Sequence, residues 1–534
     1  MPRFRTALVF AFVLCTGSPT VPATAADTFP GCGAPPTTPG PIEVVVGEVA
    51  CQQVDATGTI GGVTAFSYYV PPNCDPAITP QRTCPVMTLL HGFGGTYQGE
   101  TGTAADPSAK VRSLFSEPPV DPYAVSDPWN YADTSAWVPA EPLDFIVIAP
   151  HGRTLDGGFG PVGELDSFYT NWNPRYAFRD AGNPDGVYDG PPPRFEDFIA
   201  RDLVAFVEER FATAGHGREW RALQGTSLGG YGSYALGLKH PDVWASVGSV
   251  SGAHNFLFAP GLNPSTAVPA DGPGISLPLP YSQLPGIGPR VPVASLPEQL
   301  RGFGVSFLAF GDPAADHAFY RGNMPRDLAM NARAYAGDEQ AIALRAFVND
   351  AIPRTTADFA DFPGYLVSQA FEAIVLTMNV GMELAFDDEA VERTFEIHPG
   401  LHSGRYWNAF QRAQMQAQYA RVLHWDGTGS PGTFPDRFDY RTVATAFDVW
   451  GWRFEVDREP VEFLTLRSVS CEGLSLNGTG LVTVHVPASC GTGLNGTADF
   501  IVDLGGGRPL DEPLGLGALT FYGAARTIQL TPLG

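Results

Sequence analysis

Positive charge is scarce in this sequence of 534 residues. It has 32 Lys and Arg residues against 56 Asp and Glu residues, a formal net charge of -24, and its lysines are Lys110 and Lys239 alone. A protein that binds nucleic acid must neutralise phosphates, so this composition excludes nucleic acid as a partner. The hydrophobic fraction of 44% and the aromatic fraction of 12% are those of a globular protein.

A hydrophobic run long enough to cross a bilayer is also missing. The apolar stretch Ala7–Cys15 is too short to span a membrane, and Arg3 and Arg5 precede it. The small residues Ala23-Thr24-Ala25 follow, and this order is typical of a secretory signal peptide over residues 1–26. We therefore expect a secreted protein without a transmembrane segment.

Cysteine is rare, and the C-x-x-C spacing of zinc sites does not occur. We expect neither a metal nor a cofactor. Removing Cys15 with the signal peptide leaves six cysteines, an even number that predicts disulfides in an exported chain. Proximity in the sequence favours the pairs Cys32–Cys51, Cys74–Cys84 and Cys471–Cys490.

Apolar runs alternate with helical patterns from about residue 60 to residue 420, which predicts a mostly parallel sheet covered by helices on both faces. Strands are expected at Ile42–Val46, Val63–Val70, Cys84–Leu90, Phe145–Pro150, Val247–Val250, Phe303–Phe310 and Ala341–Val348. Helices are expected at Phe195–Phe211 and in the second half of Asp358–Met378, with residues 258–300 as a Pro/Gly-rich insertion.

The pattern of apolar and turn-forming residues changes near residue 440. Short apolar runs at Val461–Ser468, Leu481–Val486 and Phe500–Leu504 are separated by Gly/Asn turns, which predicts strands. We therefore expect an α/β domain over residues 27–435 and a small all-β domain over residues 440–534. The sequence of the second part indicates no chemistry.

The segment Gly225-Thr226-Ser227-Leu228-Gly229 has the G-x-S-x-G pattern of a nucleophile elbow. Such a turn exposes the serine hydroxyl and directs the N-terminus of the following helix at developing negative charge. A plain glycine-rich turn is the alternative. The backbone N–H of Leu228, directly after the serine, is a candidate oxyanion donor.

Two other segments complete a catalytic constellation in the order expected of an α/β-hydrolase. His91–Gly95 follows a buried strand early in the chain, and the backbone N–H of Phe93 there is the second candidate oxyanion donor. His402 comes late and is the candidate base for Ser227. His398 is the alternative base.

Over roughly residues 60–420 the sequence resembles the esterase family of α/β-hydrolases that includes feruloyl esterases, S-formylglutathione hydrolases and secreted mycolyltransferases. The segments that carry the resemblance are His91–Gly95, Gly225–Gly230, His240-Pro241-Asp242 with Ser251-Gly252, and His402-Ser403-Gly404-Arg405-Tyr406-Trp407. The last is similar to the H-S-x-x-Y-W ending of the mycolyltransferases, which includes their catalytic histidine.

The resemblance also bears on the triad acid. The segment Ala370–Leu376 is similar to the mycolyltransferase segment that carries the catalytic glutamate, which implies that Glu372 is the acid. Asp350 is the alternative, because it follows a buried strand where a generic hydrolase places its acid; Asp312 and Asp316 follow an earlier expected strand. A solvent-facing helix glutamate is the non-catalytic interpretation of Glu372.

These features predict a secreted serine carboxylic ester hydrolase that forms an acyl-enzyme on Ser227, with His402 and Glu372 completing the triad. The ester could be a small molecule, a lipid or a polymer. Acyl transfer to an extracellular acceptor shares the same acyl-enzyme and is the first alternative. A non-catalytic exported binding protein, with the β-domain as its working part, is the alternative from another class.

Overall fold

The computed structural model describes the following residues: 29, 31–93, 95–97, 143–154, 166–174, 192–255, 309–310, 316–333, 342–353, 362–423, 435–458, 461–490, 498–504 and 525–529. The expected signal peptide over residues 1–26, the insertion over residues 258–300 and Asp312 lie outside these ranges. Within the described part, no helix is both long and apolar enough to cross a membrane.

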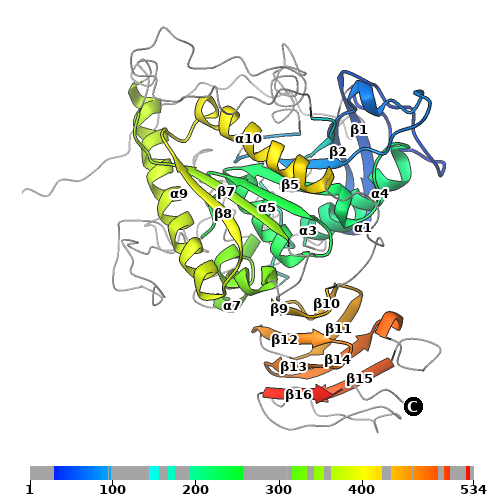
Figure 1. Ribbon diagram of the computed structural model, residues 1–534, viewed down its shortest axis with the longest axis vertical. Coiled ribbons are helices and arrows are strands. Elements are labelled where there is room, and N and C mark those ends of the chain that lie inside the picture. Colours follow the sequence, from blue (N-terminus) through cyan, green and yellow to red (C-terminus); the bar gives the residue numbers. More distant parts are fainter. Residues whose placement is uncertain are drawn as a thin grey trace, which may run out of the picture.

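Eight strands form one large sheet (Figure 1). They are β1 (Val49–Ala56), β2 (Gly62–Tyr69), β3 (Val86–Leu90), β4 (Ile146–Pro150), β5 (Arg221–Thr226), β6 (Ser246–Val250), β7 (Ala343–Asn349) and β8 (Arg393–His398). Their order across the sheet is β1-β2-β4-β3-β5-β6-β7-β8. The six strands from β4 to β8 in this order are parallel, whereas β1 and β2 pair antiparallel at one edge.

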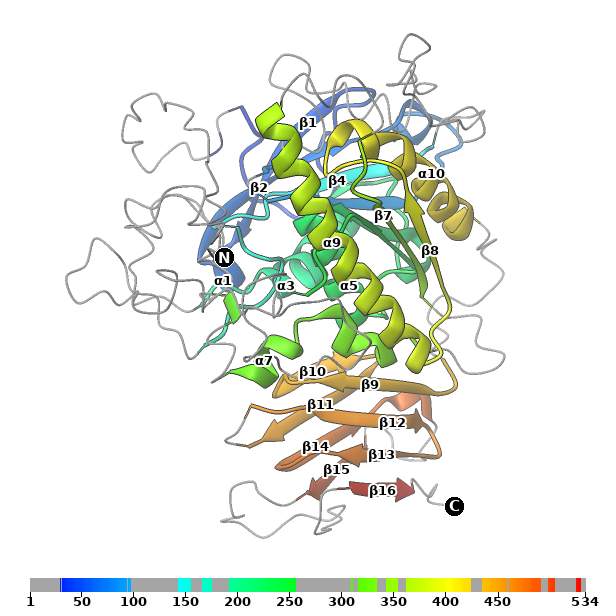
Figure 2. The ribbon, with the colours of Figure 1, turned by 90° about the vertical axis from the view of Figure 1, so that its left-hand side faces the viewer.

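Helices cover both faces of this sheet, and they differ in which strands they contact. The helices are α1 (Thr57–Ile60), α3 (Phe195–Asp197), the π-helix η5 (Phe198–Asp202), α4 (Leu203–Arg210), α5 (Leu228–Lys239), α7 (His317–Arg321), α9 (Phe362–Asp388) and α10 (Gly404–Leu423), with the 3-10 turns η1 (Pro72–Cys74), η6 (Arg218–Trp220), η10 (Pro325–Ala332) and η11 (Ala488–Cys490). Alternate residues of β5 show the two faces, because Leu223 joins the core formed with α5 whereas Ala222 packs with Met415 of α10. Helix α9 crosses in front of the sheet in Figure 2.

Most of the expected strands of the large sheet are confirmed, and two expectations are wrong. Ile42–Val46 is not a strand; the first strand is β1, whose alternating polar residues gave no apolar run. Ala309 and Phe310 are helical rather than extended, and the rest of that expected strand lies outside the described residues. Strand β8 was not expected, because it is an edge strand with half-exposed side chains.

The C-terminal strands form two four-stranded antiparallel sheets. The strands are β9 (Phe438–Thr442), β10 (Ala446–Val449), β11 (Trp452–Asp457), β12 (Leu464–Ser470), β13 (Gly473–Asn477), β14 (Leu481–Val486), β15 (Ala498–Asp503) and β16 (Ala525–Gln529). Alternate residues of both sheets share one hydrophobic core, as in a β-sandwich. Five of these eight strands were not expected, because they are short and lack an uninterrupted apolar run.

This β-sandwich contacts the end of α5 that is far from Ser227. The Tyr440 hydroxyl donates to the Lys239 carbonyl oxygen over 2.6 Å, and the Trp450 N–H donates to Asp242 over 2.9 Å. A helix of 12 residues is about 18 Å long, so the sandwich and the serine lie at opposite ends of α5. Figure 1 shows the sandwich below the large sheet.

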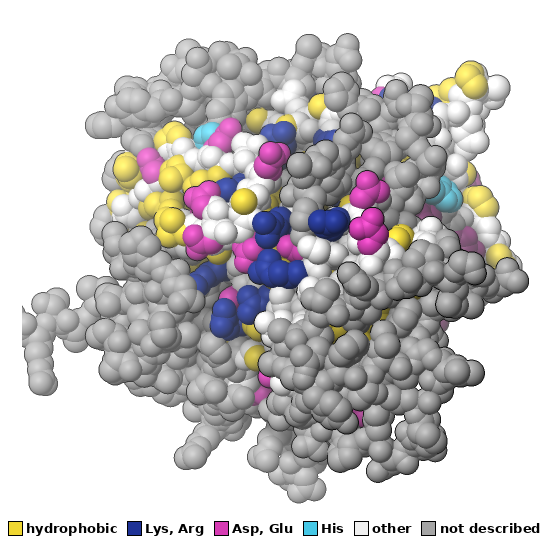
Figure 3. Space-filling model, turned by 60° about the horizontal axis from the view of Figure 1, so that its bottom comes forward, with side chains coloured by type: hydrophobic (Ala, Val, Ile, Leu, Met, Phe, Trp, Pro, Cys, Tyr) yellow, Lys and Arg dark blue, Asp and Glu magenta, His cyan; other side chains and the backbone are white. Residues whose placement is uncertain are grey.

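Ionic contacts also join the two parts. Arg333 of the α/β part and Arg467 of β12 both approach the Asp439 carboxylate to 3.4 Å. On the face drawn in Figure 3, Lys and Arg side chains gather near the centre with Asp and Glu side chains beside them. Arg333 thus links the α/β part to Asp439 of β9.

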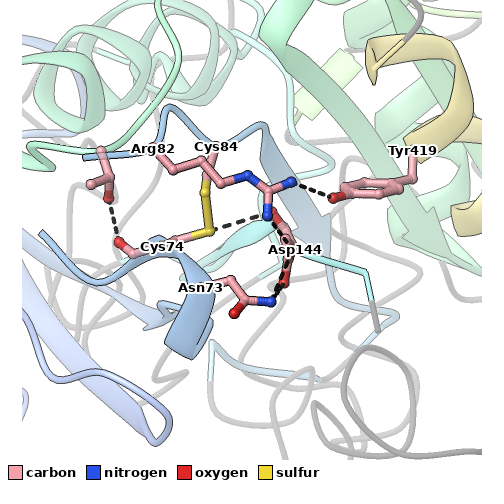
Figure 4. Close-up of a disulfide and its surroundings, with 7 residues drawn as sticks. Asn73, Cys74, Arg82, Cys84, Asp144 and Tyr419 are labelled. Atoms are coloured by element: carbon pink, nitrogen blue, oxygen red, sulfur yellow. Dashed lines mark hydrogen bonds and ion pairs between the residues drawn. A yellow bond between two sulfur atoms is a disulfide. The ribbon is translucent and has the colours of Figure 1, made fainter. Parts of the chain in front are cut away.

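Three disulfides confirm the expected pairing of cysteines: Cys32–Cys51, Cys74–Cys84 and Cys471–Cys490. Figure 4 shows the surroundings of the second. The buried Asp144 carboxylate accepts hydrogen bonds from Arg82 at 2.7 Å and from Asn73 at 3.2 Å. The disulfide closes a loop within the connection between β2 and β3, and Asp144 ties this connection to the segment before β4.

Lys239, the last residue of α5, forms a largely buried ion pair. Its ammonium group lies 2.6 Å from Glu196 Oε2, and His240 Nε2 lies 3.0 Å from Glu196 Oε1. Burial alone raises the pKa of Glu196, but Lys239 and His240 outweigh it and hold that pKa well below its usual range. Glu196 is therefore ionised in the folded protein.

We expect Glu196→Gln to lower the free energy of unfolding by about 3–5 kcal/mol at pH 7, because the charge of Lys239 is then buried without its partner. The folded pKa of Glu196 lies below the value of about 4.3 in the unfolded chain, so its stabilisation is present above that pH and fades as the pH falls. Denaturant unfolding at pH 7 and pH 3.5 checks this. Equal differences between wild type and variant at both pH values would contradict the ionised pair.

Candidate active site

Ser227 lies at the sharp turn between β5 and α5, in a strained backbone conformation with φ 56° and ψ -115°. Small neighbours are required, because a Cβ atom on Gly225 would collide with the Gly229 carbonyl, and one on Gly229 would collide with the Leu90 carbonyl. The Ser227 N–H donates to the Val250 carbonyl oxygen over 2.8 Å, which ties the turn to the end of β6. This is the geometry of a nucleophile elbow.

His402 reaches Ser227 from the loop between β8 and α10. Its Nε2 lies 2.9 Å from Ser227 Oγ, in position to accept the hydroxyl proton. The loop is fixed to α9 by two hydrogen bonds, from the His402 N–H to the Ser368 carbonyl at 3.3 Å and from Ser368 Oγ to the His402 carbonyl at 3.0 Å. Gly400, at φ 142°, leaves room for the Tyr406 ring, which packs with Leu401 in the same loop.

Glu372 lies on the inner face of α9 and is completely buried. Its Oε2 accepts a hydrogen bond of 2.6 Å from His402 Nδ1. Its Oε1 accepts hydrogen bonds from the Asn349 N–H at 2.6 Å and from Ser251 Oγ at 2.7 Å. A buried carboxylate with three donors is fixed in place and can hold the imidazole with its Nδ1 protonated. The interpretation of Glu372 as a solvent-facing residue does not fit this position.

The loop after β3 lies against the elbow. A Cβ atom on Gly92 would sit 3.5 Å from Ser227 Cβ, so the backbone next to Phe93 passes directly over the serine. His91 Nε2 accepts a hydrogen bond of 2.9 Å from the Gly152 N–H, which leaves Nδ1 protonated to donate to the Gly92 carbonyl at 2.9 Å. His91 thus shapes this loop. The Phe93 side chain is half exposed, and Leu228 is the first residue of α5.

Asp350 and His398, the alternative candidates for the acid and the base, form other contacts. Asp350 Oδ1 accepts hydrogen bonds from the backbone of Ile352 at 3.0 Å and of Gly400 at 3.1 Å, so it shapes the loops after β7 and β8. His398 Nε2 lies 2.9 Å from Glu396 Oε2 on the exposed side of β8. These contacts fit supporting roles for both residues.

His254 is a buried neutral histidine behind the elbow. Its Nε2 lies 3.0 Å from Ser249 Oγ, and its ring packs against Tyr234 with 5.0 Å between ring centroids. Burial lowers the pKa of His254 to about 3. It therefore supports the end of β6 as an uncharged group.

This lowered pKa predicts acid sensitivity. The unfolded chain binds a proton at His254 below a pH of about 6.5, whereas the folded chain keeps it neutral down to a pH of about 3. Stability is lost as the pH falls through this window, by about 2 kcal/mol between pH 6.5 and pH 5. We expect His254→Gln to flatten this loss in unfolding curves measured at pH 7 and pH 5. If wild type and variant lose the same free energy of unfolding between pH 7 and pH 5, His254 takes up its proton in the folded protein and the prediction is wrong.

Sequence reasoning missed the residues that surround Glu372. Ser251 enters the sequence analysis only as part of a resemblance and Asn349 does not enter it, yet both donate hydrogen bonds to Glu372. Their position in the sequence could have indicated them. Each stands at or just past the carboxyl end of a buried parallel strand, and the functional sites of open α/β sheets lie at these ends. In the described part of the chain, no group of three or more His, Cys, Asp or Glu residues is arranged to hold a metal ion.

A parallel sheet with a serine elbow after β5, a buried acid on α9 and a histidine after β8, in this chain order, defines an α/β-hydrolase. Comparison with protein families confirms the resemblance noted in the sequence. The family model described as "Putative esterase" matches residues 159–272, which include the elbow and the Ser251-Gly252 turn. A comparison with curated proteins gives no match.

Solved structures with similar architecture include three from named organisms. An S-formylglutathione hydrolase from Agrobacterium tumefaciens is 14% identical with a TM-score of 0.40, covering 71% of this chain and 98% of that one. A CE1 ferulic acid esterase from Anaeromyces mucronatus, in complex with ferulic acid, is 13% identical with a TM-score of 0.34, covering 72% and 97%. MPT51 of Mycobacterium tuberculosis is 15% identical with a TM-score of 0.37, covering 68% and 95%. The fold class itself follows from the strand order and direction of this chain.

Proposed function

We propose that this protein is a secreted serine esterase that hydrolyses carboxylic esters through an acyl-enzyme on Ser227. The observation that carries the proposal is the hydrogen-bonded chain from Ser227 Oγ through His402 to Glu372, with distances of 2.9 Å and 2.6 Å. The match to the esterase family over the segment that contains Ser227 supports the same reaction class.

In the first half-reaction, His402 Nε2 takes the proton of Ser227 as Oγ attacks the ester carbonyl carbon. Glu372 holds the ring in the required tautomer and stabilises the imidazolium. The backbone N–H groups of Phe93 and Leu228 are the proposed donors to the oxyanion, since Leu228 opens α5 and Phe93 adjoins the Gly92 backbone over the serine. The imidazolium then protonates the leaving alcohol, and the acyl group stays on Ser227.

In the second half-reaction, His402 removes a proton from water as the water oxygen attacks the acyl carbon. The bond from that carbon to Ser227 Oγ then breaks, and the imidazolium returns the proton to Oγ as the acid is released. An alcohol in place of water would give acyl transfer by the same steps. Both halves therefore need the same three side chains and the same oxyanion donors.

The proposed location outside the cytoplasm is supported by three disulfides. Such bonds form and persist in oxidising compartments and are rare in the cytosol.

Turnover of p-nitrophenyl esters, combined with active-site titration, tests the proposal. We expect the purified protein to release p-nitrophenol and carboxylic acid in equal amounts, and an alkyl fluorophosphonate to abolish turnover at one mole per mole of protein. Absence of turnover with acetyl, butyryl, octanoyl and feruloyl esters would contradict hydrolysis. Turnover that survives full labelling would contradict a serine nucleophile.

A further inference from the structure

The turn Ser251-Gly252 after β6 is buried and contacts Glu372 and Trp407. Ser251 has a left-handed backbone with φ 45°, is fully buried, and donates its N–H to the Phe347 carbonyl over 2.8 Å. The next turn residue, Gly252, has its carbonyl held by the Asn379 side chain at 2.8 Å. A residue kept in this conformation must be fixed by its surroundings.

The turn is fixed to the same face of α9 that carries the triad acid. Asn379 and Glu372 are seven positions apart, which is about two helical turns, and both are completely buried. One holds the Gly252 carbonyl and the other accepts the Ser251 hydroxyl. Figure 2 shows α9 running across the large sheet.

Two hydrogen bonds at Ser251 Oγ determine where its proton goes. Trp407 Nε1 lies 3.1 Å from Ser251 Oγ, and Glu372 Oε1 lies 2.7 Å from it. An indole N–H can only donate, so the Ser251 oxygen accepts from Trp407. Its single proton is then free to point at Glu372. The indole therefore sets the direction of the hydroxyl.

The same tryptophan packs against the catalytic imidazole. The rings of Trp407 and His402 meet edge to face, with centroids 4.7 Å apart and an interplanar angle of 88°. Trp407 thus contacts the base through its ring and the acid through Ser251. With Oε1 of Glu372 occupied by Ser251 and the Asn349 N–H, Oε2 faces His402 Nδ1.

We propose that Ser251 is a positioning residue for Glu372, and that the Trp407 indole N–H acts through Ser251 by directing its hydroxyl at the carboxylate. This inference rests on the proposed esterase function of the same site. Its consequence is that the carboxylate is held in one orientation, so that His402 keeps its Nδ1 proton and presents Nε2 to Ser227.

Steady-state kinetics of Ser251→Ala test the first part. We expect kcat to fall on the order of 10- to 100-fold, the size of a lost hydrogen bond to a charged group, while KM stays unchanged because Ser251 does not line the substrate side. Without this donor the carboxylate places more negative potential on His402, which favours the imidazolium. The acidic limb of the pH profile of kcat/KM should therefore move to higher pH.

A double-mutant cycle tests the second part. Trp407→Phe keeps an aromatic ring beside His402 but removes the N–H. We expect it to lower kcat several-fold in the wild-type background and to have no further effect in the Ser251→Ala background. Equal effects of Trp407→Phe in both backgrounds would overturn the coupling. If Ser251→Ala does not fold, Trp407→Phe alone tests the proposal. A shift of its acidic limb to higher pH supports the proposal, and an unchanged limb would overturn it.

Ser249→Ala is the matched control, since Ser249 is an equally buried serine two residues earlier that contacts His254 instead of Glu372. Its acidic limb should match wild type even if its thermal stability falls. A wild-type protein without Ser227-dependent turnover would overturn the esterase function and this inference together. An active wild type in which Ser251→Ala leaves kcat and the acidic limb unchanged would overturn only this inference.

Discussion

Replacement of Ser227 by alanine is expected to lower kcat for ester hydrolysis on the order of 10⁶-fold, because the substitution removes the atom that bonds to the acyl group. The elbow should survive the change. Its strained turn is imposed by the close contacts of Gly225 and Gly229 and by the bond from residue 227 N–H to the Val250 carbonyl, none of which uses the hydroxyl. Initial rates with a p-nitrophenyl ester measure the effect.

A serine elsewhere in the same sheet provides the control. Ser246 stands at the start of β6, at the opposite end of the strand from the site, and is completely buried. We expect Ser246→Ala to keep kcat within a few-fold of wild type, since surface and core changes away from a site act mainly on stability. Comparable losses in both variants would mean that the fold, and not the nucleophile, was affected.

Replacement of Glu372 by glutamine is expected to lower kcat by about 10⁴-fold, as for other triad acids changed to the amide. The amide has one acceptor oxygen, whereas Glu372 accepts from His402, Ser251 and the Asn349 N–H together. An NH₂ group facing His402 would select the tautomer that cannot accept the serine proton. KM should change little, because the acid does not touch the substrate.

Asp350→Asn is the matched comparison for this prediction. The Asp350 carboxylate bonds to backbone N–H groups of Ile352 and Gly400, which an asparagine oxygen can also accept. We expect kcat within a few-fold of wild type. The reverse result, with Asp350→Asn nearly inactive and Glu372→Gln active, would assign the acid to the end of β7.

The nucleophile and the base could be proposed from sequence because each is marked locally. The elbow needs glycines at fixed positions around Ser227, and the collisions that a Cβ would cause at Gly225 and Gly229 explain why. His402 stands in a short motif with Tyr406 and Trp407. The three disulfides were also predictable, since each closes a short loop of chain.

The acid could not be derived from local pattern. Glu372 lies within a helix of 27 residues that is mostly apolar, and its role depends on which helix face meets the ends of β6 and β7. Resemblance indicated it, whereas strand position alone indicated Asp350. The partners Ser251 and Trp407 are separated by 156 residues, so their hydrogen bond is a product of tertiary packing.

The two edge strands of the large sheet were not predicted from the sequence. β1 and β8 lie at the two edges of the large sheet, where one side of the strand or more is accessible and polar residues are tolerated. The inner strands β3, β4 and β6 are buried along their whole length and were expected from their apolar runs. A parallel strand buried on both faces requires a continuous apolar run, and this run is what allows the strand to be predicted from sequence.

The most direct test of the central claim is to trap the acyl-enzyme. The protein is mixed with a p-nitrophenyl ester, quenched in acid within the first turnovers, digested and analysed by peptide mass spectrometry. We predict an added acyl mass on Ser227, absent from Ser227→Ala and accumulating without release in His402→Gln to the extent that acylation still occurs. Continued turnover with acyl mass on another residue, or on none, would contradict a serine esterase centred on Ser227.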